Sequence, residues 1–304
     1  PQHAVPPPLR LPSPPFPHNS IASFGWYWAM EDGTGNSTAV NERNCTAPGP
    51  CSWDHANVDF VQNSWKNPSR WQPDGAAEWD ASDVLELASK GVRSVVSVTH
   101  LFAAGPAGPL LSDYETRWAK YLALMKAAGA LPHVAYWYPA DEPDLPAHGL
   151  PAASLNKITA AIKAQSPDIP ILLALSNLAF NESTGGLNYA LDTTQMKPTD
   201  VLTFDIYSSG TTFWPLFQAK LDVLSAFVTE HNISMAVIPD ATAGTFAALG
   251  AVGNNVLNDL FYQYCARRPT CVGLFPFVGG TWHNIVTEPA VFASFNAVAD
   301  AVKT

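Results

Sequence analysis

The sequence is poor in charged residues, which fill 14% of its 304 positions, and basic residues are scarcer than acidic ones. Sixteen lysines and arginines stand against 26 aspartates and glutamates, so the formal net charge is -10. The basic residues form no run, and the pair Arg267-Arg268 is the densest place. Because nucleic-acid binding needs clustered Lys and Arg side chains, the composition argues against a nucleic-acid partner.

Long apolar runs are also missing, although 47% of the residues are hydrophobic. No run approaches the roughly 20 residues of a membrane-spanning helix, so we expect no membrane partner. A chain of 304 residues has room for one α/β barrel of about 250 residues, or for two small domains. Residues 1–18 are rich in proline and predict an extended arm, and we expect one domain over residues 19–304.

Cysteine is rare, and its four residues come as two close pairs that predict two short disulfide loops. Free thiols are the alternative, whereas the spacing does not fit a zinc site of the Cys-x₂-Cys type. Four Asn-x-Ser/Thr sequons also favour a secreted glycoprotein. The chain starts at Pro1 without a signal sequence, and we interpret it as a mature secreted protein whose leader has been removed. The expected disulfides are Cys45 with Cys51 and Cys265 with Cys271, and the expected glycosylation sites are Asn36, Asn44, Asn181 and Asn232.

Short apolar runs alternate with longer amphipathic ones along the chain, which is the pattern of repeated strand-helix units. Eight predicted strands, seven of them followed by a predicted helix, indicate a single (β/α)₈ barrel with a long disulfide-bearing loop after the first strand. Gly91 is predicted to end a helix as its C-cap. A doubly wound open sheet is the alternative fold, but no Gly-x-Gly-x-x-Gly turn follows the first strand. The predicted strands are Ile21–Met30, Asn57–Val61, Val92–His100, His133–Ala140, Ile169–Ser176, Val201–Tyr207, Ile233–Pro239 and Val272–Phe277. The predicted helices are Ala81–Lys90, Ser112–Ala128, Ser154–Gln165, Tyr189–Met196, Trp214–His231, Asn255–Cys265 and Ala290–Val302.

Barrel active sites lie at the C-terminal ends of the strands, and polar or aromatic residues stand at most of these predicted ends. Along the sixth strand, alternation places Leu202, Phe204 and Ile206 on the helix side and Asp205 with Tyr207 inside the barrel. Asp205 is then either functional or a structural anchor for a neighbouring loop. The side chains that we predict to contact substrate are Trp26, Trp28, His100, Tyr138, Asn177, Tyr207 and Trp282.

The segment Asp141-Glu142-Pro143 carries the sharpest chemical signal. Cleavage of a glycosidic bond needs a carboxylic acid that protonates the leaving oxygen, and a second group that stabilises the sugar cation. Glu142 follows the aromatic run Tyr136 to Tyr138, and we expect desolvation and the adjacent Asp141 to raise its pKa. A surface Asp-Glu pair that merely opens a loop is the alternative.

This segment resembles the Asn-Glu-Pro that ends strand four in the large clan of barrel glycosidases with catalytic glutamates on strands four and seven. The resemblance implies that Glu142 is the acid/base, with Asp141 in place of Asn. Strand seven of that clan ends in a nucleophilic Glu, whereas this chain has Pro239-Asp240. The shorter Asp side chain alters the carboxyl separation on which a retaining mechanism depends.

The adjacent Asp-Glu pair also resembles that of the substrate-assisted N-acetylhexosaminidases of glycoside hydrolase families 20 and 123. That resemblance implies that Glu142 is the acid and that Asp141 orients the substrate acetamido group, which acts as nucleophile. Tyr207 would then assist Asp141, and Asp240 would bind substrate.

Together these residues predict a secreted, monomeric glycoside hydrolase with Glu142 as general acid, Asp141 as its immediate partner, and Asp240 or Asp205 as the second functional carboxylate. We expect a carbohydrate substrate and neither a cofactor nor a metal, since the histidines show no paired spacing. The rival interpretation is a catalytically inactive barrel that binds glycans.

Overall fold

The computed structural model describes residues 23–24, 58–61, 73–89, 91–103, 108–145, 149–176, 179–181, 186–206, 214–239 and 260–275. The predicted arm over residues 1–18, the loop with Cys45 and Cys51, and the predicted helix Ala290–Val302 lie outside these residues.

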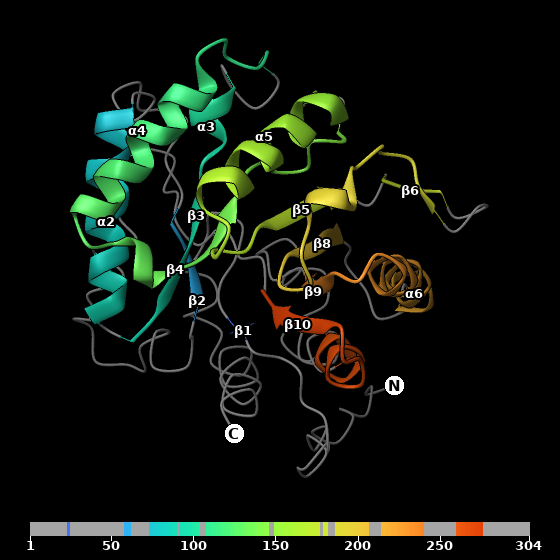
Figure 1. Ribbon diagram of the computed structural model, residues 1–304. Coiled ribbons are helices and arrows are strands. Elements are labelled where there is room, and N and C mark those ends of the chain that lie inside the picture. Colours follow the sequence, from blue (N-terminus) through green and yellow to red (C-terminus); the bar gives the residue numbers. More distant parts are fainter. Residues whose placement is uncertain are drawn as a thin grey trace, which may run out of the picture.

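Parallel strands form the centre of the molecule (Figure 1). They make a five-stranded sheet in the order β1-β10-β9-β8-β5 and a three-stranded sheet in the order β2-β3-β4. Each strand overlaps the segment predicted for it. The strands are β1 (Ser23–Phe24), β2 (Val58–Val61), β3 (Arg93–Ser97), β4 (Val134–Tyr138), β5 (Leu172–Ser176), β8 (Val201–Ile206), β9 (Ser234–Pro239) and β10 (Cys271–Leu274).

The two sheets meet where β4 runs beside β5, and we call this contact the β4–β5 seam. Isolated parallel bridges join Trp137 to Ile171 and Asp141 to Ala174. The backbone N–H of Trp137 donates to the Pro170 carbonyl at 2.9 Å. At the opposite edges of the sheets, β1 contacts β2. The strands thus follow one another in chain order, as in a (β/α)₈ barrel, and the fold prediction is confirmed in this arrangement.

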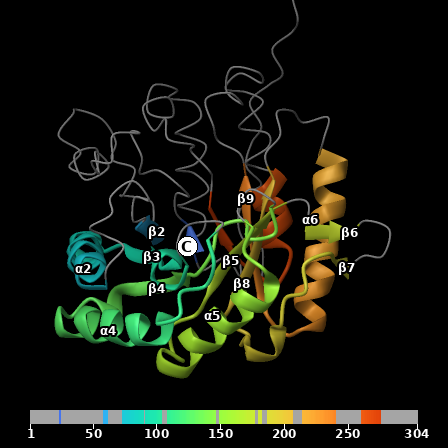
Figure 2. The same cartoon turned by 90° about the horizontal axis from the view of Figure 1, so that it is seen from above.

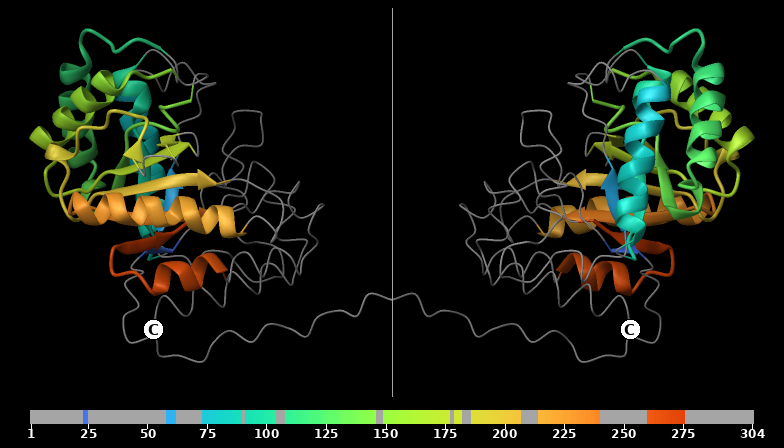
Figure 3. Two further views of the ribbon diagram at one scale, coloured as in Figure 1. Left: turned by 90° about the vertical axis from the view of Figure 1, so that its right-hand side faces the viewer. Right: turned by 90° about the vertical axis from the view of Figure 1, so that its left-hand side faces the viewer.

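The described helices lie on the outside of these strands (Figure 1). Figure 2 shows α2 and α4 on the side of β2, β3 and β4, and α6 on the opposite side, beyond β9. Figure 3 shows α6 and a further helix over 260–266 running alongside one another. The helices are α2 (Pro73–Ser89), α3 (Thr99–Phe102), α4 (Tyr114–Ala127), α5 (Ala152–Gln165) and α6 (Trp214–Glu230), with 3₁₀ turns at Leu131–His133 and Thr193–Gln195 and a small antiparallel pair of β6 (Phe180–Asn181) with β7 (Gly186–Leu187).

Three of these helices end in the same way, with a left-handed residue directly after the last turn. Gly91 and Gly129 both have φ of 77° and Asn232 has φ of 52°. After α2, the Gly91 N–H donates to the Ala88 carbonyl and the Val92 N–H to the Leu87 carbonyl, both at 3.0 Å. This is the Schellman pattern, and it confirms Gly91 as a C-cap.

Strand residues alternate between two cores, which we call the inner core and the outer core. Val201 lies with residues such as Ala174 and Ile238 in the inner core, enclosed by the strands. Leu202 and Phe204 pack in the outer core, between strands and helices. The alternation predicted for the sixth strand is therefore confirmed at these positions, which places Asp205 on the inner face.

Two predicted helices have different bounds in the structure. Helix α2 begins at Pro73 instead of Ala81, because proline suits the first helical turn and Asp74 complements the positive end of the helix dipole. The prediction of a helix over Tyr189–Met196 is wrong, since this segment forms only a 3₁₀ turn over Thr193–Gln195. The side chain of Asp192 accepts the Thr194 N–H at 2.9 Å, and such local bonds favour a turn over a long helix.

The Cys265–Cys271 disulfide is present, with a Cα–Cα distance of 5.2 Å, and the prediction of this pair is confirmed. It joins the helix over 260–266 to the first residue of β10.

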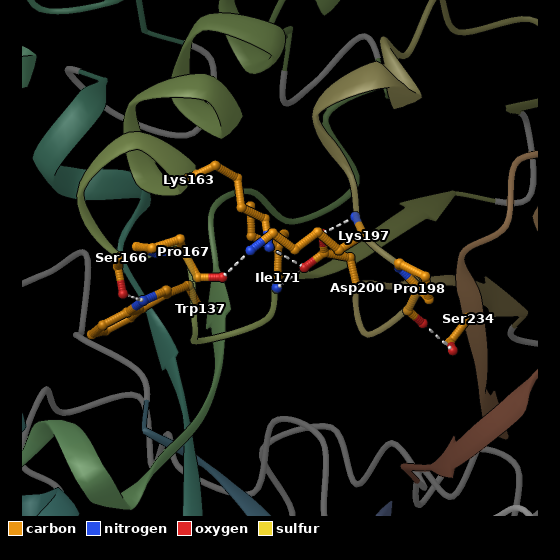
Figure 4. A network of polar contacts seen from close by, with 9 residues as sticks. All are labelled: Trp137, Lys163, Ser166, Pro167, Ile171, Lys197, Pro198, Asp200 and Ser234. Atoms are coloured by element: carbon orange, nitrogen blue, oxygen red, sulfur yellow. Dashed lines mark hydrogen bonds and ion pairs between the residues drawn. The ribbon is translucent and has the colours of Figure 1, made fainter.

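A polar network ties together the N-terminal ends of β5, β8 and β9 (Figure 4). Asp200 is completely buried, and its carboxylate accepts a hydrogen bond from the ammonium of Lys163, whose side chain is 7% exposed. The same carboxylate accepts the backbone N–H groups of Ile171 and Lys197, each at 2.7 Å. Because a buried charge must be paired and hydrogen-bonded, this network fixes the face of the barrel opposite the C-terminal strand ends.

Candidate functional site

The turn after β4 has an unusual backbone. Glu142 has φ of 40°, in the left-handed region that residues other than glycine seldom adopt. Its N–H donates to the Ala174 carbonyl of β5 at 3.1 Å, and its carbonyl accepts the Leu145 N–H at 3.0 Å. These bonds hold Glu142 at the C-terminal end of the β4–β5 seam. Strained residues of this kind cluster at functional sites, and the turn is a candidate site on that ground.

Asp141 is oriented by a hydrogen bond from Tyr138, the last residue of β4. The hydroxyl of Tyr138 donates to Oδ1 of Asp141 at 2.6 Å. Tyr138 is buried in the inner core, whereas Asp141 and Glu142 are both partly exposed. The predicted substrate contact Tyr138 is thus placed beneath Asp141, where its hydroxyl positions a carboxylate.

A third acidic residue of the same turn, Asp144, holds the end of the neighbouring strand. Its Oδ1 accepts the backbone N–H of Ser176 at 2.8 Å, and its Oδ2 accepts the Ser176 hydroxyl. Burial, together with the negative charge of Asp144, raises the pKa of Tyr189, so that phenol stays protonated and donates to the Leu150 carbonyl at 2.8 Å. We did not predict the contact between Asp144 and Ser176 from the sequence. The available signal was an Asp two residues beyond Glu142, with a Ser at the end of the next strand.

Asp205 reaches the same edge of the sheet from β8. Its Cα pairs with that of Ser176 on one side and with that of Ile238 on the other. The residue is only 2% exposed, in line with its inner-face position. The structure therefore places Asp141 and Glu142 directly after β4 and Asp205 near the C-terminal end of β8, with β5 between these two strands.

His100 lies in α3 and not at a strand end, because β3 stops at Ser97. It is 5% exposed, which suits packing better than open contact with a ligand. The other predicted site residues lie outside the described residues, namely Trp26, Trp28, Asn177, Tyr207, Asp240 and Trp282.

Trp137 corrects one element of the sequence interpretation. We expected the aromatic run before Glu142 to desolvate it, but Trp137 points away from the inner core and packs edge-on against Trp118 with ring centroids 5.1 Å apart. Its Nε1 donates to the Ser166 hydroxyl at 2.9 Å. Strand alternation explains the error: Tyr136 and Tyr138 face inward, so the residue between them must face the helices.

Tyr136 extends the inner core towards β1. Its hydroxyl lies 3.0 Å from that of Ser23, and burial raises its pKa. The group is thus a neutral hydroxyl that links β4 to β1 beneath the candidate site.

In the described part of the chain, no group of three His, Cys, Asp or Glu side chains is placed to hold a metal ion. Among the described helices we find none with the length and hydropathy of a membrane-spanning segment.

No protein-family model and no curated protein sequence matches the chain. Solved structures do match it. Fungal β-1,4-galactanases superpose with a TM-score of 0.58 at 13% identity, over 91% of this chain and 99% of theirs. A glycoside hydrolase family 5 enzyme from Prevotella bryantii B14, crystallised with a xyloglucan tetradecasaccharide, gives 0.55 at 12%, over 92% and 97%. An endo-β-1,4-mannanase from Cellulomonas fimi gives 0.58 at 13%, over 93% and 71%. The chain therefore has the fold of the barrel glycoside hydrolases.

Proposed function

We propose that the chain is a glycoside hydrolase in which Glu142 is the general acid. The observation that carries the proposal is the left-handed conformation of Glu142 at the end of β4, held by its bond to Ala174. A fold that tolerates this backbone cost beside a second carboxylate has a functional reason to place the side chain there. The similar solved structures, a galactanase, a xyloglucan-bound enzyme and a mannanase, support a polysaccharide substrate.

In this mechanism, Glu142 protonates the oxygen of the leaving sugar, and a second group stabilises or traps the cationic centre. Asp141 suits contact with substrate because it is partly exposed and its Oδ1 is held by Tyr138. Asp205, at 2% exposure, suits a role in bracing the strand ends. Asp141 is therefore the partner that we assign; on an N-acetylated glycan it would orient the acetamido group that acts as nucleophile. Asp240, next to the end of β9, is the alternative partner in a retaining double displacement.

The decisive experiment is Glu142→Gln, which keeps the shape of the side chain and removes its acid. We expect kcat to fall by roughly 10²- to 10⁴-fold, the usual contribution of a general acid. Release of reducing ends would be measured on β-1,4-galactan, β-1,4-mannan, xyloglucan and chitin oligosaccharides. Glu230→Gln is the matched control, since Glu230 is exposed at the end of α6 on the opposite face. Full activity in the Glu142→Gln variant would rule out the assignment.

Asp141→Asn separates the two routes. On an N-acetylated aryl glycoside, substrate assistance predicts a large loss of kcat, because Asp141 no longer orients the acetamido group. A double displacement through Asp240 does not use the acetamido group, so it predicts that wild-type activity shows no preference for N-acetylated substrates.

A catalytically inactive, glycan-binding barrel is the second candidate, because the same fold and aromatic residues serve binding. In that case the wild-type chain binds a member of the panel and releases no reducing ends. Glu142→Gln would then leave its affinity unchanged.

We also propose that the protein is secreted and glycosylated. The Cys265–Cys271 disulfide fits an oxidising compartment, and the sequon residue Asn232 is exposed in the turn after α6. Treatment of protein from a eukaryotic host with peptide N-glycosidase tests the second point by a loss of mass.

A further inference from the structure

We propose that Asp144 is a positioning residue that holds Glu142 in its left-handed conformation. The inference rests on the proposed function, since it gives a reason for the carboxylate to be in this turn. Asp144 lies two residues beyond Glu142, and both of its oxygens are used by Ser176 of β5.

The turn is attached to β5 at two points that lie two residues apart on that strand. Glu142 donates its N–H to the carbonyl of Ala174, and Asp144 accepts the N–H and the hydroxyl of Ser176. Asp141 also forms a parallel bridge with Ala174. A turn fixed at both ends has few backbone solutions, and a strained residue persists only where its surroundings determine it.

The bonds of Asp144 also set the place of the general acid relative to Asp205. Ser176 is the residue that Asp144 binds, and its Cα pairs with that of Asp205 in β8. One carboxylate therefore connects the turn that carries Glu142 to the strand that neighbours Asp205. A displacement of about 1 Å in such a site can cost about 10²-fold in rate.

The first test compares Asp144→Ala with Asp144→Asn. An asparagine can accept the Ser176 N–H with its carbonyl and donate its amide to the Ser176 hydroxyl, so it keeps both bonds without the charge. We expect Asp144→Ala to lower kcat by roughly 10- to 100-fold with KM changed little. Asp144→Asn should restore most of the activity. The assay is reducing-end release on the polysaccharide of the panel that the wild-type chain cleaves fastest.

Asp192→Ala is the matched control. Asp192 accepts a backbone N–H at 2.9 Å and a hydroxyl at 2.6 Å, both from Thr194, in a turn that leads to the N-terminal end of β8. This substitution removes the same two kinds of bond far from the site, so kcat should stay at the wild-type value. Asp144→Asn as inactive as Asp144→Ala would show that the charge matters and not the geometry, and would overturn the inference. Wild-type activity in Asp144→Ala would also overturn it.

A second test needs no activity, so it separates this inference from the proposed function. If Asp144 enforces the strained backbone of Glu142, its removal lets the residue relax, which offsets part of the lost hydrogen bonding. In a Glu142→Gly background there is no strain to relax. Asp144→Ala should then lower the urea midpoint of unfolding more in the Glu142→Gly background than in wild type. Equal shifts in both backgrounds would overturn the inference, even in a chain that cleaves no glycan.

Discussion

The backbone at Glu142 makes a prediction about stability that is opposite in sign to the usual one. Replacing alanine by glycine in a folded protein normally destabilises it, because glycine loses more freedom on folding. At φ of 40° the order should reverse. Glu142→Gly is therefore expected to be more stable than Glu142→Ala, although both lack the proposed general acid.

The magnitude follows from two opposing terms. A residue with a Cβ carries about 1 to 2 kcal/mol of steric cost in the left-handed region. Glycine avoids this cost, but its unfolded chain has more conformational freedom than that of alanine, so ordering it on folding costs about 0.5 to 1 kcal/mol more. The difference lies between about 0 and 1.5 kcal/mol and centres near 0.75 kcal/mol in favour of Glu142→Gly over Glu142→Ala. Comparison of these two variants cancels the contacts of the glutamate side chain, which both have lost.

The assay is equilibrium unfolding in urea, followed by tryptophan fluorescence, with the free energy taken from the midpoint and slope. Two controls calibrate it. Gly91→Ala places a Cβ at φ of 77° with no heavy atom within 4 Å, so it reports the backbone cost alone and should destabilise the fold. Ala123→Gly lies at an exposed position within α4 and should cost about 1 kcal/mol in the ordinary direction.

A single comparison decides the matter. If Glu142→Gly is less stable than Glu142→Ala by as much as Ala123→Gly is below wild type, Glu142 has an ordinary backbone. The strain argument for its function would then be refuted.

The remaining predictions concern the scaffold around the site. Asp200→Ala should destabilise the fold by about 3 to 5 kcal/mol, because it leaves the Lys163 ammonium buried without its partner. Lys163→Met should lower the free energy of unfolding by less in the same urea assay. Equal losses in the two variants would contradict the view that the unpaired ammonium causes the loss. Tyr121→Phe removes a 2.6 Å bond to a buried aspartate and should cost about 1 to 3 kcal/mol, unless that aspartate finds another donor. Burial raises the pKa of Tyr121 well above 10. The protonated Tyr121 phenol therefore contributes its full stability below pH 10, and this contribution is lost as pH rises through the folded-state pKa. In a pH series, the Tyr121→Phe variant should lack this decrease in the free energy of unfolding at alkaline pH. Removal of the short disulfide by Cys265→Ala with Cys271→Ala should lower the free energy of unfolding by about 2 kcal/mol, and an unchanged midpoint would show that the loop is already constrained.

The strands were predictable because their periodicity is a local property. In β8, Leu202 and Phe204 alternate with polar or smaller residues, and both pack in the outer core. The same rule applied to β4 predicts that Trp137 faces the helices, but we read its aromatic neighbours as one cluster. The Cys265–Cys271 disulfide was also predictable from the sequence, since the chain has four cysteines and these two lie only six residues apart.

The candidate site was predictable only in its location. The position of Glu142 follows from the strand order, but its left-handed backbone arises from bonds to another strand. Ser176 is more than thirty residues away from Asp144 in the sequence, and no local pattern connects the two. Such pairs become visible only when the register of adjacent strands is known.

The short turn near Thr193 and the early start of α2 at Pro73 show the same limit on a smaller scale. A Pro-Asp-Gly sequence suits a turn as well as a first helical turn, and burial of the following residues decides between them. Asp192 likewise decides its turn through a side-chain bond to the backbone that no average propensity describes.

The β4–β5 seam has a consequence for how the molecule fluctuates. Neighbouring strands within each sheet pair over two or more residues, whereas isolated bridges and single bonds connect β4 to β5. The amide protons of Trp137 and Glu142 each take part in a seam bond, so their rates of hydrogen exchange measure how often the two sheets part. Since Glu142 is itself one of the joining residues, opening of the seam would also displace the proposed general acid. A glycan bound across the strand ends should therefore slow the exchange of both amides together.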